Sequence, residues 1–125
     1  MTELKSNIEW RLWGKVDPLF GVATWQNKQR GSASAWTDTE FYALGESDWR
    51  DFLGHWDNYG VNKESCLEVG CGAGRITRHL ARSFDRVYAV DVSTEMIAYA
   101  RERIPADNVE YALTDGLNLP RSVTA

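Results

Sequence analysis

Three glycines at alternate positions follow a short apolar segment in Leu67-Glu68-Val69-Gly70-Cys71-Gly72-Ala73-Gly74. Glycine lets the backbone turn sharply and lets a ligand come close, because no Cβ blocks either. A helical pattern begins directly after the last glycine, and the amides of such a turn and of the first helical turn can bind a carboxylate or phosphate group. The pattern predicts a ligand site where this strand meets this helix.

Two carboxylates accompany the glycine segment. Asp91 stands 21 residues after Gly70, at the end of a second apolar run, Val87-Tyr88-Ala89-Val90. A carboxylate about 20 residues downstream of such a loop is placed to accept hydrogen bonds from ribose hydroxyls. Glu68 ends the first strand, where an unpaired buried carboxylate would be costly, which favours a functional role. The pattern indicates a nucleoside-containing ligand; a ligand-free turn and an Asp91 that only caps the next helix are the structural alternatives.

From residue 65 onward the sequence alternates between strand and helix patterns. We expect strands at 65–69, 86–90 and 109–114, and helices at 75–83 and 93–104. Ser93 is a suitable N-cap for the second helix, and Pro105 ends it. This order predicts an α/β fold with parallel strands and right-handed crossovers, arranged 3-2-1 in the sheet.

The first 60 residues have a different composition, because all six tryptophans precede residue 60. We expect a helix at 8–16 that ends at Asp17-Pro18, since the residue before proline avoids the helical region. A polar loop is expected at 26–39, and then a helix from an N-cap at Ser47 to a stop at Gly60. The chain is therefore divided into a helical aromatic segment, 1–60, and an α/β segment, 61–125, within one compact unit.

Composition narrows the classes of function. The 125 residues fit one domain, and a net charge of −4 without a basic face argues against strong nucleic-acid binding. A run of 18 apolar residues is lacking, so no membrane span is expected. Cys66 and Cys71 match no metal or redox spacing. We expect no metal site, reduced cysteines and a soluble cytoplasmic protein.

Three motifs in order resemble those of the class I S-adenosylmethionine-dependent methyltransferases, of the methyltransferase-11 or -25 type. The first is Glu68–Gly74, an acidic residue followed by three alternating glycines. The second is Val87–Ser93 with Met96, and the third is Val109–Gly116 with Leu119-Pro120. The resemblance runs from about residue 40 to 120. It implies a Rossmann-like methyltransferase fold with S-adenosyl-L-methionine as the cofactor.

The resemblance also implies roles for individual residues. Glu68 faces the ammonium side of the cofactor, and the backbone of the loop (Gly70, Cys71, Gly72 and Gly74) gives the cofactor room. Asp91 binds both ribose hydroxyls, and Val92 and Met96 pack on the adenine. Asp115, with the backbone of Gly116 or Leu117, meets the adenine amino edge. An anionic lining suits a cationic sulfonium, whereas a dinucleotide fingerprint spaces its glycines as Gly-x-Gly-x-x-Gly.

The expected reaction is in-line transfer of the methyl group to a nucleophile on a small-molecule acceptor. The sulfonium is already reactive, so positioning and desolvation do much of the work, and we nominate no catalytic base. Trp36, Phe41 and Tyr42 are candidates for covering the cofactor and lining the acceptor pocket, because aromatic faces suit a cation. Packing of a core and lid is the structural alternative for these aromatic residues.

The family fold has seven strands, and this sequence stops shortly after its third. We therefore expect the C-terminal half of the sheet to be absent and the first strand to be an open edge. A fragment, a truncated gene product and a half-domain completed by a partner or a second copy are the alternatives. The second functional hypothesis is a non-catalytic S-adenosylmethionine-binding or assembly module, and a nicotinamide-dependent oxidoreductase is the third.

Overall fold

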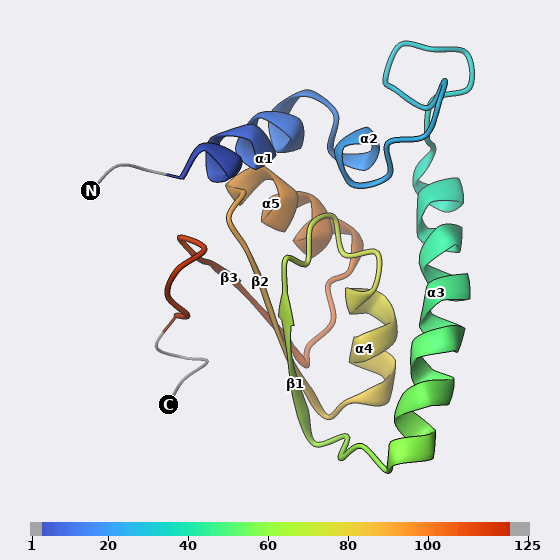
Figure 1. The fold of residues 1–125 in the computed structure, drawn as a ribbon, viewed down its shortest axis with the longest axis vertical. Helices are drawn as coiled ribbons and strands as arrows, with labels where there is room; N and C mark the ends of the chain where they lie inside the picture. Colours follow the sequence, from blue (N-terminus) through green and yellow to red (C-terminus); the bar gives the residue numbers. More distant parts are fainter. Residues whose placement is uncertain (1–3, 121–125) are drawn as a thin grey trace.

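Three parallel strands form the sheet in this computed structural model, which describes residues 4–120 (Figure 1). The strands are β1 (Ser65–Val69), β2 (Arg86–Asp91) and β3 (Val109–Leu113), in the order β1-β2-β3. Cys66 pairs with Val87, which in turn pairs with Val109. The predicted α/β class, parallel pairing and strand order are confirmed.

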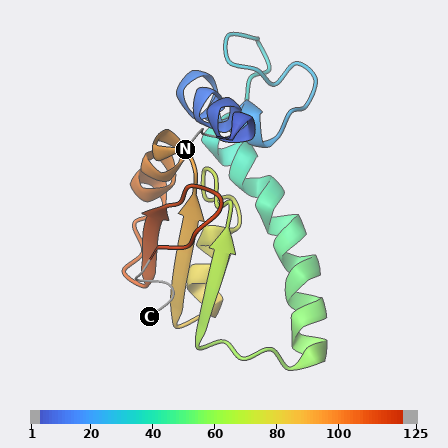
Figure 2. The same cartoon turned by 60° about the vertical axis from the view of Figure 1, so that its left-hand side comes forward.

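Two crossover helices connect the strands, α4 (Thr77–Ser83) and α5 (Thr94–Arg103). Helix α5 begins as predicted, because the Ser93 hydroxyl accepts a hydrogen bond from the Met96 amide at 3.1 Å. Helix α4 begins at Thr77, two residues later than predicted, because turns continue from Gly72 to Ile76. Together with α3, both helices lie on the same face of the sheet (Figures 1 and 2).

Helix α3 (Asp38–Tyr59) is much longer than predicted. Ser47 is an interior residue of this helix, so the predicted N-cap is wrong. The true N-cap is Thr37, whose side chain accepts from the Glu40 amide at 3.2 Å. Phe41 and Tyr42 add buried positions about two turns ahead of Trp49, which the apolar spacing from Trp49 onward does not reveal. Gly60 ends the helix in the left-handed conformation, as predicted.

The N-terminal segment forms α1 (Lys5–Val16) and α2 (Pro18–Val22). Helix α1 includes the predicted helix, and Asp17 ends it. The sequence interpretation missed α2. The Asp17-Pro18 pair that ends α1 also begins α2, because proline suits the first helical position and the Asp17 carboxylate accepts from the Phe20 amide at 3.4 Å.

Two clusters of buried side chains make up the core. One cluster joins the N-terminal segment to the glycine loop and α5, and it consists of Leu19, Phe41, Tyr42, Ala73, Met96 and Ile104. The other fills the space between α3, α4 and β2, and it consists of Trp49, Leu80, Phe84 and Val87. Burial of these side chains fixes the position of the glycine loop relative to α3 and α5.

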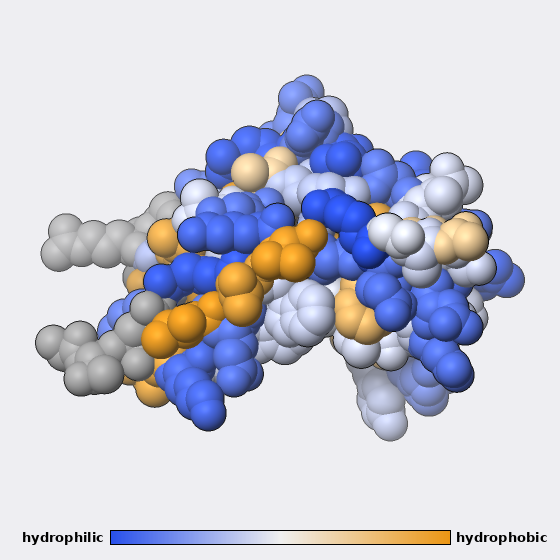
Figure 3. All heavy atoms as spheres, turned by 90° about the horizontal axis from the view of Figure 1, so that it is seen from above, coloured by the Kyte–Doolittle hydropathy of each residue, from blue (hydrophilic) through white to orange (hydrophobic). Residues whose placement is uncertain are grey.

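Helix α1 lies above the carboxyl ends of the strands (Figures 1 and 2). Asn7 and Gly14 are its buried residues. Ile8, Leu12 and Val16 are exposed, and a row of hydrophobic side chains crosses the upper face of the molecule (Figure 3). The inward face of α1 therefore contributes polar groups to the end of the sheet where parallel folds bind ligands.

Candidate functional site

A cavity of about 420 Å³ lies at the carboxyl ends of the strands. Residues from both sequence segments line it. Those singled out from the sequence are Glu68, Gly70, Cys71, Gly72, Asp91, Val92, Met96 and Gly116. Those contributed by the N-terminal helices are Ser6, Asn7, Trp10 and Val22. The structure therefore brings most of the predicted site together under α1.

The glycine loop is tied to the end of the neighbouring strand. The amides of Gly70 and Cys71 both donate to the Val90 carbonyl, at 2.8 and 3.0 Å. Gly70 has φ +76°, and a Cβ there would meet no described atom within 4 Å, so the space beside it belongs to the cavity. At Gly74, with φ +87°, a Cβ would lie 2.5 Å from Ile104 Cδ1. One glycine thus opens the site and the other lets the loop pack against α5.

Asp91 is buried at the carboxyl end of β2 and holds the two loops beside it. One carboxylate oxygen accepts from the Gly72 amide at 2.8 Å, and the other accepts from the Ser93 amide at 3.0 Å. Each oxygen keeps capacity for a further hydrogen bond. The carboxylate is therefore already oriented at the wall of the cavity, so a ligand with two adjacent hydroxyls can bind without reordering it.

Glu68 is half-buried at the end of β1 and also lines the cavity. Burial raises the pKa of its carboxyl to about 7, and the nearby charge of Asp91 acts in the same direction. The Thr77 hydroxyl donates to it, and this hydrogen bond together with Arg75 partly offsets the increase. Near neutral pH the protonated and charged forms of this carboxyl are therefore both populated. A cation that enters the cavity would favour the charged form.

Arg75 is the basic residue in the described lining. Its guanidinium forms an ion pair with Asp48 on α3. This pairing leaves Glu68 and Asp91 as the acidic groups that face the cavity. A cationic ligand suits such a lining better than a pyrophosphate does.

Asp115 and Leu117, two of the predicted adenine contacts, lie outside the lining. The Asp115 carboxylate accepts from the Leu117 amide at 2.8 Å and from the Asn118 amide at 2.7 Å, so it shapes its own turn. Leu117 is 63% exposed. Gly116 lies between them and does line the cavity. The loop therefore presents backbone to the cavity and keeps its carboxylate outside.

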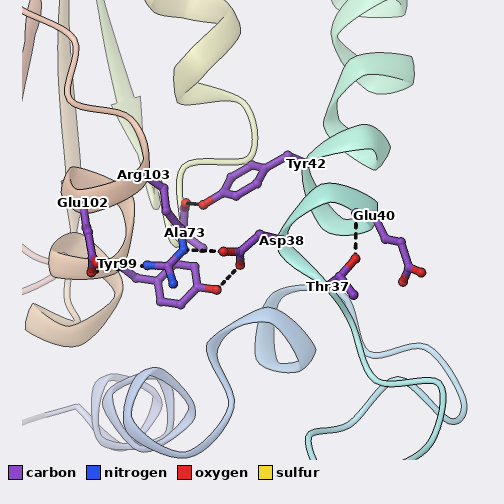
Figure 4. A network of polar contacts seen from close by, with 8 residues as sticks. All are labelled: Thr37, Asp38, Glu40, Tyr42, Ala73, Tyr99, Glu102 and Arg103. Atoms are coloured by element: carbon purple, nitrogen blue, oxygen red, sulfur yellow. Dashed lines mark hydrogen bonds and ion pairs between the residues drawn. The ribbon is translucent and has the colours of Figure 1, made fainter.

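Trp36, Phe41 and Tyr42 lie behind the glycine loop and not over the cavity. Phe41 and Tyr42 are buried, and Trp36 packs against them. The Tyr42 hydroxyl donates to the Ala73 carbonyl at 2.7 Å (Figure 4). Burial raises the pKa of Tyr42, so the hydroxyl keeps its proton. In this arrangement the aromatic residues pack against the loop and support it.

Helix α1 supplies the cover that sequence reasoning had assigned to those aromatics. The Asn7 amide nitrogen donates to the Asp115 carbonyl at 2.7 Å, and Arg11 Nε donates to the Val92 carbonyl at 3.2 Å. Trp10 lines the cavity beside them. One signal was available in the sequence: the seven-residue spacing of Asn7 and Gly14 places a polar and a small residue on the same face of the helix.

The described residues, 4–120, contain no group of three metal-ligating side chains close enough to hold an ion. Over the same range, the structure has no helix that is both long and apolar enough to cross a membrane. The two cysteines are unpaired, and burial raises the pKa of Cys66 to about 11 and that of Cys71 further. Both thiols are therefore held in the protonated form at neutral pH.

Part of the chain is similar to known methyltransferases. A family model described as "Methyltransferase domain" matches residues 66–124. A malonyl-[acyl-carrier protein] O-methyltransferase of Acetivibrio thermocellus is 43% identical over 51 residues, which are 39% of this chain and 18% of that protein. A tRNA/tmRNA (uracil-C(5))-methyltransferase of Idiomarina loihiensis is 39% identical over 51 residues, 41% of this chain and 14% of the relative.

The fold is also similar to that of a solved methyltransferase structure. The N-methyltransferase NodS of Bradyrhizobium japonicum WM9, in complex with S-adenosyl-L-homocysteine, is similar with a TM-score of 0.52 and 26% identity. The match covers 62% of this chain and 40% of NodS. The chain spans between 14% and 22% of the length of the curated relatives that it matches.

Proposed function

We propose that this chain, whose residues 66–124 belong to the class I S-adenosylmethionine-dependent methyltransferases, binds S-adenosyl-L-methionine in the cavity under α1. The observation that carries the proposal is the geometry of Asp91. Its carboxylate is buried at the wall of the cavity and oriented by the amides of Gly72 and Ser93. A preoriented carboxylate at the end of the second strand suits a ribose diol.

The other residues of the cavity fit the rest of the cofactor. Glu68 is the carboxylate for the ammonium side, and the open space beside Gly70 accommodates the amino-acid end. Val92 and Met96 supply apolar surface for adenine. For Asp115 we propose a role in holding the turn, while Gly116 presents backbone to the adenine edge.

The cofactor supplies an electrophilic methyl group on a positive sulfur, and the chain supplies position and shielding from water. Helix α1 shields the cavity by bonding to the loops after β2 and β3. Trp10 offers an aromatic face in the lining, which suits a sulfonium. We propose a small-molecule acceptor, supported by the net charge of −4, which disfavours a nucleic acid.

A structure with bound S-adenosyl-L-homocysteine tests this proposal. The product should lie between the glycine loop and α1, with both ribose hydroxyls on the Asp91 carboxylate. Difference density at another place, or a cavity that holds only solvent at a saturating ligand concentration, would reject the proposal.

A second candidate function is a cofactor-binding module that a second copy or a partner chain completes. It is favoured by the position of β1 at the edge of the sheet, with Leu67 and Val69 exposed. Two measurements together distinguish the candidates: sedimentation of the chain with and without S-adenosyl-L-homocysteine, and an assay of methyl transfer. A monomer that transfers methyl groups supports the enzyme, whereas a ligand-binding dimer without turnover supports the module.

A further inference from the structure

A second hollow, of about 470 Å³, lies between α4 and the end of α5. It shares no lining residue with the cofactor cavity. Arg78 and Arg82 reach it from α4, and Arg103 reaches it from α5. These arginines are the charged groups of its lining, so the hollow is surrounded by positive charge.

Two of the three arginines are held by their neighbours. Arg103 donates from Nε to the Asp38 carboxylate at 2.8 Å, and its guanidinium lies 3.3 Å from the centre of the Tyr99 ring (Figure 4). The Arg78 guanidinium lies 5.8 Å from the centre of the Tyr42 ring, which forms part of the same lining. These contacts limit the movement of both groups, which lowers the entropy cost of binding an anion.

The positive charge of the hollow is only partly balanced. Asp38 compensates Arg103, but the ion pairs within residues 4–120 include neither Arg78 nor Arg82. The neighbouring His79 reflects this field, because burial and then the charges of both arginines lower its pKa. Glu46 lines the adjoining hollow with Arg78 and Arg103 and offsets part of this field. The lining of the hollow itself contains no acidic residue, so it carries a net positive charge.

We propose that this hollow binds a phosphate monoester. Such a group carries nearly two negative charges at neutral pH, which suits a lining whose charged groups are all arginines. The planar guanidinium donates paired hydrogen bonds to phosphate oxygens. The hollow exceeds a bare phosphate in size, and Ala81, Pro105 and Ala106 give it an apolar wall for the organic part of the ester.

Titration of the ¹⁵N-labelled chain with phenyl phosphate at low ionic strength tests this site. We expect amide shifts at Arg78, Arg82 and Ala106, with weaker binding of the monoanionic analogue benzoate. The double variant R78Q/R82Q should bind phenyl phosphate at least about tenfold more weakly, since each arginine donates charge-assisted hydrogen bonds. The single variant R82Q, at an exposed position, should show an intermediate loss.

R50Q is the matched control, because Arg50 is an exposed arginine on α3 outside the lining of the hollow. It changes the net charge equally and should leave the affinity unchanged. An equal loss in R50Q and R82Q would show a nonspecific charge effect and overturn the proposal. Benzoate binding as tight as phenyl phosphate, or shifts confined to the cofactor cavity, would also overturn it.

Discussion

The Tyr42 hydroxyl, carried by α3, donates a 2.7 Å hydrogen bond to the Ala73 carbonyl in the middle of the glycine loop. The bond is buried, and its acceptor is part of the turn that separates Gly72 from Gly74. A helix of the N-terminal segment thus holds the loop that lines the cavity under α1, the proposed cofactor site. Support of this kind keeps a binding loop in place before the ligand arrives.

Removing that hydroxyl should loosen the loop. In Tyr42→Phe the buried Ala73 carbonyl loses its partner, which costs about 1–3 kcal/mol of the free energy of unfolding. Denaturant unfolding measures the loss. Tyr88→Phe, at a half-buried tyrosine of β2, is the control. An unchanged free energy of unfolding in Tyr42→Phe would contradict the supporting role.

Gly74→Ala should destabilise the fold by about 1–3 kcal/mol, because the residue has φ +87° and its Cβ would lie 2.5 Å from Ile104 Cδ1. Gly54→Ala provides the opposite case. Gly54 lies within helix α3, and a Cβ there would meet no described atom of another part of the fold within 4 Å. Alanine should stabilise that position by up to about 1 kcal/mol. Thermal unfolding of both variants checks the prediction, and a loss of stability at Gly54 equal to that at Gly74 would refute it.

Glu68 should make both stability and cofactor binding depend on pH. Its pKa of about 7 lies above the 4.5 of the unfolded chain, so the unfolded state ionises first. The carboxyl therefore lowers the free energy of unfolding as the pH rises from 4.5 to 7. Glu68→Gln should lack this decline, as denaturant unfolding at several pH values would show.

Binding of the cationic cofactor should lower the pKa of Glu68, which burial raises. A positive charge beside Glu68 favours the carboxylate, so binding near pH 7 should release protons and strengthen as the pH rises. Calorimetry in two buffers of different ionisation enthalpy measures the released protons. Proton release as large in Glu68→Gln as in the wild type would assign the effect to another group.

His79 should reduce stability in acid. Its ring stacks on Trp49 with centroids 5.7 Å apart, and its Nε2 atom is buried without a partner among the described residues. Burial, and then Arg78 and Arg82, lower its pKa below 6.5, so the unfolded state binds the proton first. The free energy of unfolding should therefore fall as the pH drops below 6.5.

The variant His79→Phe separates this effect from that of Glu68. Phenylalanine keeps a ring against Trp49 but does not titrate. The wild type should therefore lose stability relative to the variant as the pH falls from 7 to 5. A constant difference across this range would show that His79 does not titrate differently in the two states.

The local parts of the fold could be predicted from the sequence. The glycines at 70, 72 and 74 and the N-cap at Ser93 act within a few residues of themselves, so their spacing identifies the turn and the start of α5. The start of α3 was mistaken, because Thr37 precedes a stretch whose apolar positions, Phe41 and Tyr42, become evident as core only after folding. Local patterns therefore specify the strands and the glycine turn better than the positions where helices begin.

The cover of the cavity could not be predicted in the same way. Asn7 bonds to Asp115 across a separation of 108 residues, and the spacing of residues does not reveal such a pairing. The turn at Asp115 shows the same limit, because an Asp-Gly sequence suits both a ligand contact and a self-capped turn. The structure has the self-capped turn, with the Asp115 carboxylate on the amides of Leu117 and Asn118.

Calorimetric titration of the wild type and Asp91→Ala with S-adenosyl-L-methionine is the most direct test of the central claim, with NAD as the competing ligand. The wild type should bind S-adenosyl-L-methionine and not NAD, and Asp91→Ala should lose at least about tenfold in affinity. Asp51→Ala, at an exposed carboxylate of α3, should bind like the wild type. Equal affinity of Asp91→Ala and the wild type, or preferential binding of NAD, would contradict the account.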